Sequence, residues 1–61
     1  MFSILVVEDN ADMRELFCTV LTDGGYRAIP AADGQEALEV MERQYIDLIA
    51  ADVMMLRMAM S

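Results

Sequence analysis

The stretch Ile4-Leu5-Val6-Val7-Glu8-Asp9-Asn10 decides the fold of this chain. Its four apolar residues form a short continuous run, which is typical of a strand buried on both faces in a parallel sheet. Glu8 and Asp9 follow where this strand ends, at the edge of the sheet where open α/β folds form their sites. Two acids after a strand also fit a solvated turn before a helix, because carboxylates favour the positive end of the helix dipole.

The length and composition limit the classes of protein to which the chain can belong. A chain of 61 residues forms at most one domain, and such a domain buries only ~60% of its unfolded surface. Metal binding or self-association would help to stabilise it. Apolar residues make up 57% of the chain, too many for a disordered protein, yet no apolar run reaches the ~20 residues that cross a membrane. The N-terminus lacks a signal-peptide pattern, so we expect a cytoplasmic protein.

Charge and residue types exclude several kinds of site. Eleven acidic residues and four scattered arginines give a net charge of −7. Because nucleic-acid and anionic membrane surfaces attract clustered cations, we expect no direct nucleic-acid binding and no membrane attachment. The single cysteine, Cys18, cannot form an internal disulfide, and the absence of histidine excludes a Cys/His zinc site. A hydrolytic Ser/His/Asp or Cys/His set is excluded for the same reason, so we expect that the chain is not an enzyme.

Two amphipathic segments are predicted to be helices. The first begins after Asn10, which can cap it, and ends at Gly24-Gly25. Its apolar stripe consists of Met13, Leu16, Phe17, Val20 and Leu21. The second runs from about Gly34 to Arg43 and is capped by Asp33. The residues expected to face inward on it are Ala37, Leu38 and Met41.

Two further segments are predicted to be strands. Tyr26 to Ala31 is expected at an edge of the sheet, because Pro30 cannot donate to a strand ladder. Ile46 to Val53 is again apolar and again reaches an acid, Asp52. The alternation of strands and helices implies parallel strands with right-handed crossovers. With the helices on opposite faces, the fold is α/β with a three-stranded parallel sheet of order 2-1-3.

This strand order brings the ends of the first and third strands together, with Glu8 and Asp9 on one side and Asp52 on the other. Carboxylates ~4 Å apart repel by about 4 kcal/mol at an effective dielectric of about 20, so the cluster must take a proton, spread apart or bind a cation. Mg²⁺ suits such a site because it takes oxygen ligands and keeps several waters. A carboxylate beside it can attack phosphorus and form an aspartyl phosphate. The alternative is that Asp52 merely ends a strand.

Three groups of motifs occur in order along the chain: Val6-Val7-Glu8-Asp9-Asn10, Ala32-Asp33-Gly34 with Glu36-Ala37-Leu38, and Asp47-Leu48-Ile49 leading to Asp52-Val53-Met54-Met55. In these motifs and their spacing, the chain resembles the receiver domain of two-component response regulators over about residues 4 to 55. The resemblance implies half of a flavodoxin-like receiver fold over residues 1–53, followed by a methionine-rich tail at 54–61.

The resemblance also implies roles for individual residues. Asp52 would be the phospho-acceptor in a phosphorelay, with a histidine kinase as the source of the phosphate. Asp9 would bind Mg²⁺ directly and Glu8 through a water, and the Met54 carbonyl would be a further ligand.

The chain departs from the family pattern in two respects. After the Met-Met pair the family has a proline, two residues and Asp-Gly, whereas this chain reads Leu56-Arg57-Met58-Ala59-Met60-Ser61. A whole receiver has five strands and adds a hydroxyl residue and a lysine that hold the phosphoryl oxygens. Losing such donors typically costs a few kcal/mol each in transition-state stabilisation. We therefore expect a truncated receiver in which Mg²⁺ binding and phosphorylation are weakened.

The third strand is expected to lie at the other edge of the sheet, where its apolar residues invite pairing with another chain. These residues are Leu48, Ile49, Ala50 and Ala51. A two-fold dimer would join two such strands into a sheet of order 2-1-3-3′-1′-2′. The methionines of the tail would cover bare apolar surface, or the tail would fray. The alternative function is thus a self-associating half-fold without signalling chemistry. The cognate kinase, the output domain and the pathway stay open.

Overall fold

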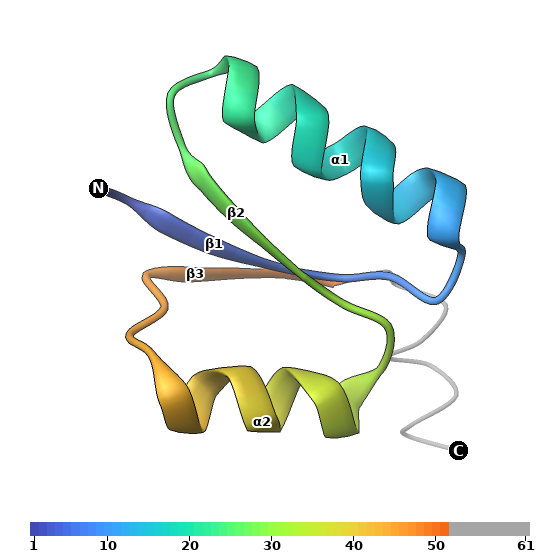
Figure 1. Cartoon of the computed structure of the whole chain (residues 1–61), viewed down its shortest axis with the longest axis vertical. Coiled ribbons are helices and arrows are strands. Elements are labelled where there is room, and N and C mark those ends of the chain that lie inside the picture. The colour runs from blue at the N-terminus through green and yellow to red at the C-terminus, as the bar shows by residue number, and fades with distance from the viewer. Residues whose placement is uncertain (52–61) are drawn as a thin grey trace.

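The computed structural model describes residues 1–51 and shows the predicted alternation of strands and helices. The elements are β1 (Ser3–Val7), α1 (Ala11–Asp23), β2 (Arg27–Ala31), α2 (Gly34–Arg43) and β3 (Leu48–Ala51). The two helices lie on opposite faces of the sheet (Figure 1). No helix within residues 1–51 is long and apolar enough to cross a membrane. The expected tail at 54–61 and the domain boundary after residue 53 lie outside the described residues.

The three strands are parallel, and their order is β2-β1-β3, which confirms the predicted order 2-1-3. Val7 pairs with Ala31 on one side and with Ala51 on the other, so the strands end at the same level. β2, which contains Pro30, lies at one edge as predicted, and β3 lies at the other. The shared level of the strand ends is what brings the residues that follow them to one edge of the sheet.

β3 begins later than predicted, at Leu48 rather than Ile46. Two hydrogen bonds of Asp47, the residue just before β3, explain the later start. The backbone N–H of Ser3 donates to the Asp47 carboxylate at 2.7 Å, and the Asp47 N–H donates to the Ser3 carbonyl at 2.9 Å. A side chain therefore replaces the backbone acceptor that a longer strand would supply. Ile46 precedes Asp47 in the loop between α2 and β3 and packs against the core.

Both helices begin directly after the capping residues that the sequence predicts. The Asn10 side chain accepts a hydrogen bond from the Met13 N–H at 3.0 Å, and the Asp33 side chain accepts one from the Glu36 N–H at 2.9 Å. Gly24 caps the C-terminal end of α1, and Gly25 follows with a φ of 91°, a conformation that L side chains rarely adopt.

The face of the sheet under α2 is closed by a small apolar core. Leu5, Val7, Ala31 and Ala37 are buried together, and Val40 and other half-buried residues pack against them. One of the three residues expected to face inward on α2 does not: Leu38 is 56% exposed. Met41 is 39% exposed and lies one helical turn after the buried Ala37. α2 contacts the sheet through Ala37 and Val40, which lie three residues apart on one helix face, and Leu38 is turned about 100° away from Ala37.

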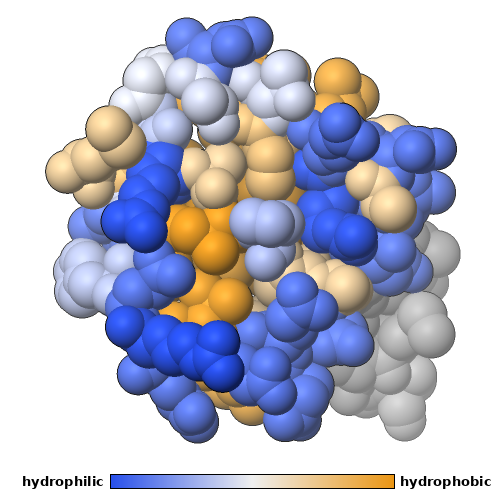
Figure 2. Space-filling model, in the orientation of Figure 1, coloured by the Kyte–Doolittle hydropathy of each residue, from blue (hydrophilic) through white to orange (hydrophobic). Residues whose placement is uncertain are grey.

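The face under α1 is open by comparison. None of the α1 residues, all of which the structure describes, is buried, although the predicted apolar stripe is present. Met13, Leu16, Phe17 and Val20 are each between 40% and 59% exposed. Within residues 1–51 the helix packs mainly against β2 and makes few contacts with β3. Figure 2 shows apolar surface between the two helices in that view, surrounded by hydrophilic surface.

Candidate functional site: the acidic edge of the sheet

Glu8 and Asp9 lie where β1 ends, as predicted from the sequence. Side chains alternate along a strand, so Glu8 faces the α1 side of the sheet together with Val6. Glu8 is buried, with 4% of its surface exposed, whereas Asp9 is exposed. One of the two adjacent acids is thus held inside the fold, and the other is open to solvent.

Hydrogen bonds hold Glu8 at this position. Its carboxylate accepts the Asn10 N–H at 3.1 Å, and its own N–H donates to the Ala31 carbonyl at 3.0 Å. Its carbonyl accepts a hydrogen bond from Nη1 of Arg14 at 2.9 Å. Burying a carboxylate costs free energy unless it is hydrogen-bonded, and the Asn10 N–H provides one such bond. The other two contacts hold the Glu8 backbone at the start of the loop between β1 and α1.

The structure tests the predicted site only in part. Asp52 and Met54 lie outside the described residues, so two of the four predicted site residues can be placed. Ala51, the last described residue, pairs with Val7, and β1 and β3 therefore end next to each other. Asp52 follows Ala51 directly in the chain.

The donor chemistry of this edge fits Mg²⁺. One or two carboxylates with several waters satisfy this ion, and Glu8 and Asp9 supply two adjacent carboxylates at one point of the fold. Within residues 1–51 there is no group of three acidic, cysteine or histidine side chains that would hold a metal ion. Glu8 and Asp9 are therefore the two carboxylates that the described part of the chain offers at this edge.

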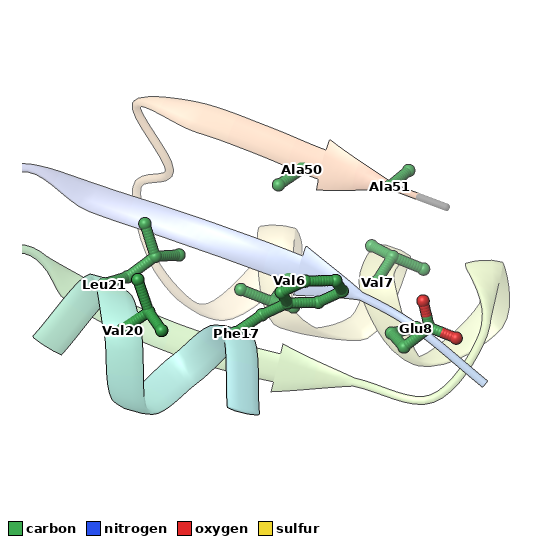
Figure 3. A pocket seen from close by; sticks show the side chains of 8 residues that line it. All are labelled: Val6, Val7, Glu8, Phe17, Val20, Leu21, Ala50 and Ala51. Atoms are coloured by element: carbon green, nitrogen blue, oxygen red, sulfur yellow. The ribbon is translucent and has the colours of Figure 1, made fainter. Parts of the chain in front are cut away.

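A hollow of about 320 Å³ lies beside Glu8 on the open face, between α1 and the strands β1 and β3. Figure 3 shows three α1 side chains directed toward the sheet and the Glu8 carboxyl at one end of the hollow. The lining residues are Val6, Val7, Glu8, Phe17, Val20, Leu21, Ala50 and Ala51. This hollow was not evident from the sequence. The available signal was Ala50, a small residue that pairs with Val6 on the α1 side of the sheet and cannot reach the apolar stripe of α1.

Two more residues of α1 gain significance from the structure. Arg14 had been noted only as one of four scattered arginines, yet its guanidinium reaches back to the acidic loop. Its position four residues after the capping Asn10, one helical turn along, was the available signal. Cys18 is half-buried one turn further on. Burial raises the pKa of its thiol above the ordinary value of 9.0, and the positive charge of Arg14 opposes that rise.

Comparison with known proteins agrees with this geometry. The family model described as the response regulator receiver domain matches residues 4–59. The "Probable transcriptional regulator ycf27" of Pyropia yezoensis is 48% identical over 52 residues, which are 85% of this chain and 21% of that protein. The "Response regulator RR06" of Streptococcus pneumoniae is 44% identical over 55 residues, 90% of this chain and 25% of that protein.

A third relative is of a different kind. The "CAI-1 autoinducer sensor kinase/phosphatase CqsS" of Vibrio cholerae is 44% identical over 52 residues, 85% of this chain and 8% of that protein. This chain thus spans a quarter or less of the length of these relatives. No solved structure gives a significant match. The three-stranded parallel sheet and the match to the family model lead to one conclusion: this chain belongs to the response regulator receiver domain family.

Proposed function

We propose that the chain is a phospho-acceptor module of a phosphorelay, in which Asp52 receives a phosphoryl group from a histidine kinase. Glu8 and Asp9, with the Met54 carbonyl, are the proposed Mg²⁺ ligands. The observation that carries the proposal is the pairing of Val7 with Ala51, because the residues that follow these two are Glu8 and Asp52. The relative named as a sensor kinase/phosphatase supports a kinase partner.

In the proposed transfer, a carboxylate oxygen of Asp52 attacks phosphorus. The new oxygen–phosphorus bond forms as the phosphorus–nitrogen bond of the phosphohistidine breaks, and the leaving imidazole keeps that electron pair. Mg²⁺, when bound, neutralises negative charge on the phosphoryl oxygens. Asp9, exposed at the end of β1, is the proposed direct ligand, and the buried Glu8 acts through a water. The cytoplasmic location and the absence of direct nucleic-acid binding stay predictions.

The test is to incubate the chain with Mg²⁺ and a small acyl phosphate and to measure its intact mass. We expect the mass of one phosphoryl group on the unaltered chain and none on Asp52→Asn. Asp23→Asn removes an exposed carboxylate at the end of α1 and serves as the matched control, which should be labelled like the unaltered chain. Equal labelling of the Asp52→Asn variant, or no labelling of the unaltered chain, would contradict the proposal.

We propose a second function, self-association through β3, on a separate observation. β3 pairs with β1 alone among the described strands, and Leu48 and Ile49 on it are 52% and 49% exposed. An exposed apolar edge strand is a template for pairing with another chain. A second copy pairing antiparallel with β3 would extend the sheet to the order 2-1-3-3′-1′-2′. The net charge of −7 on each copy opposes this contact, so added salt should favour it.

Sedimentation at several concentrations and salt levels tests the dimer. We expect a concentration-dependent dimer that Leu48→Lys weakens, because a charge at the edge would be desolvated on pairing. Tyr45→Lys places the same charge on an 81% exposed side chain outside β3 and should leave the dimer unchanged. A monomer at all concentrations, or equal effects of the two variants, would refute this second function.

A further inference from the structure

We propose that Arg14 is a positioning residue for the acidic loop: its side chain holds the Glu8 backbone directly before Asp9 and so fixes how Glu8 and Asp9 are presented to a divalent cation. This inference deepens the proposed function, since it rests on the Mg²⁺ site proposed above. Nothing in the family match assigns a role to Arg14. The argument comes from its hydrogen bonds and its charge.

The Arg14 side chain bonds the loop at one point: its Nη1 donates to the carbonyl of Glu8 at 2.9 Å. The backbone N–H of Arg14 donates to the Asn10 carbonyl at 2.9 Å, but this is the first hydrogen bond of α1 and would form with any residue here except proline. A further bond, from the Asn10 N–H to the Glu8 carboxylate, closes the same loop. The guanidinium therefore holds the residue before Asp9, and the start of α1 holds the residue after it.

The choice of acceptor matters for the charge of the site. The guanidinium bonds a backbone carbonyl, and within residues 1–51 it forms no salt bridge with the carboxylates of Glu8 or Asp9 that would neutralise them. A cation bonded directly to those carboxylates would compete with Mg²⁺. The half-buried Arg14 instead adds positive charge near the acids without bonding their carboxylate oxygens.

The side chain also suits the task geometrically. A guanidinium is planar and directs its N–H groups in fixed directions, whereas the lysine ammonium is a compact point charge on a flexible chain. We therefore expect Arg14→Lys to restore only part of what Arg14→Gln removes. Residues that orient metal ligands without touching the metal typically change metal affinity by 10–100-fold when they are replaced.

The first measurement uses the chain without metal. Amide hydrogen exchange at Asn10 reports the bond to the Glu8 carboxylate, and exchange at Leu5 and Val6 reports the global stability of β1. We expect Arg14→Gln to accelerate exchange at Asn10 by about tenfold relative to Leu5 and Val6, and Arg14→Lys to do so less. Arg43→Gln makes the same charge change at the end of α2 and should leave the ratio unchanged. A purely structural role would change all three amides together.

The second measurement titrates each variant with Mg²⁺ and follows the backbone amide resonances of the acidic loop. We expect Arg14→Gln to weaken the affinity by about tenfold or more and Arg43→Gln to leave it unchanged. Equal Mg²⁺ affinities and equal Asn10 exchange in the two variants would overturn the inference. If the unaltered chain binds no Mg²⁺, the proposed function fails. The ratio of the Asn10 exchange rate to the rates of Leu5 and Val6 then decides alone. A higher ratio in Arg14→Gln upholds the positioning of the loop by Arg14, and an unchanged ratio overturns it.

Discussion

The two faces of the sheet differ in how well one helix covers them. Under α2, the side chains of Leu5 and Val7 meet Ala37, and the loop before β3 adds Ile46 to the same cluster. Under α1, no helix residue is buried, and a hollow of about 320 Å³ stays open above β1 and β3. The apolar run of β1 is buried on both faces, so the difference comes from the helices and loops that cover the sheet.

The two faces differ in what they carry: one holds the packed core, and the other holds a residue of the proposed site. The closed face holds the packed core, and the open face carries the buried Glu8 at the end of the hollow (Figure 3). On the α2 side, Ala31 and Ala37 are small, so the helix can approach the sheet closely. On the α1 side, Ala50 of the edge strand β3 pairs with Val6, and its small side chain leaves space between β3 and the helix.

The largest expected effect separates the two faces directly. Leu5 is fully buried against the α2 side, and Leu5→Ala should lower the free energy of unfolding by about 2–5 kcal/mol. Leu16 on α1 is 53% exposed, and Leu16→Ala should cost less than about 1 kcal/mol. Urea unfolding of both variants measures the difference. Equal losses would show that α1 is packed as tightly as α2, which contradicts the comparison.

The second effect concerns the glycines next to the two helices. Gly25 follows α1 with a φ of 91°, so Gly25→Ala should destabilise the fold by about 1 kcal/mol. Gly34 begins α2 with a negative φ and no heavy atom within 4 Å of an added Cβ, so Gly34→Ala should be neutral or slightly stabilising. Thermal unfolding of the pair checks this order. A loss for Gly34→Ala as large as that for Gly25→Ala would show that φ is not the cause.

The smallest effect concerns Cys18 on α1. Burial raises the pKa of its thiol above 9.0, so less reactive thiolate is present at about pH 8.5 than in the unfolded chain. The folded state therefore binds this proton more tightly. The small stabilisation that results is fully present below the unfolded pKa and is lost as the pH rises through the folded pKa.

The pH dependence of Cys18 alkylation by iodoacetamide measures this shift. Its midpoint should lie higher in the native chain than in urea. Arg14→Gln should raise the native midpoint further, because the charge of Arg14 opposes the effect of burial. An unchanged midpoint in that variant would place the guanidinium away from Cys18.

The sequence predicts the order and direction of the strands because the relevant signals are local. Apolar runs, the capping residues Asn10 and Asp33 and the glycines after α1 each act within a few residues. The start of β3 was predicted wrongly because it depends on Asp47 bonding to Ser3, a contact between residues 44 positions apart in the chain. The inward face of α2 was misassigned at Leu38, since spacing alone does not say which part of an apolar stripe meets the sheet.

For the candidate site, too, the local features were predicted from the sequence and those that depend on tertiary contacts were not. Glu8 and Asp9 were predicted at the end of β1, because a strand that ends in acids places them at the edge of the sheet. The role of Arg14 was missed, since it depends on a side chain reaching back one helical turn to a backbone carbonyl. The hollow was missed as well, because it reflects where α1 lies relative to β3.

The central claim is that the ends of β1 and β3 form one cation site. Mn²⁺ prefers the same oxygen ligands as Mg²⁺ and broadens the resonances of nearby nuclei. At low Mn²⁺ concentration we expect the amide resonances of Glu8, Asp9 and Asp52 to broaden first and together, and excess Mg²⁺ to restore them. Broadening that begins at the acids of α2, or that affects Asp9 without Asp52, would contradict the claim.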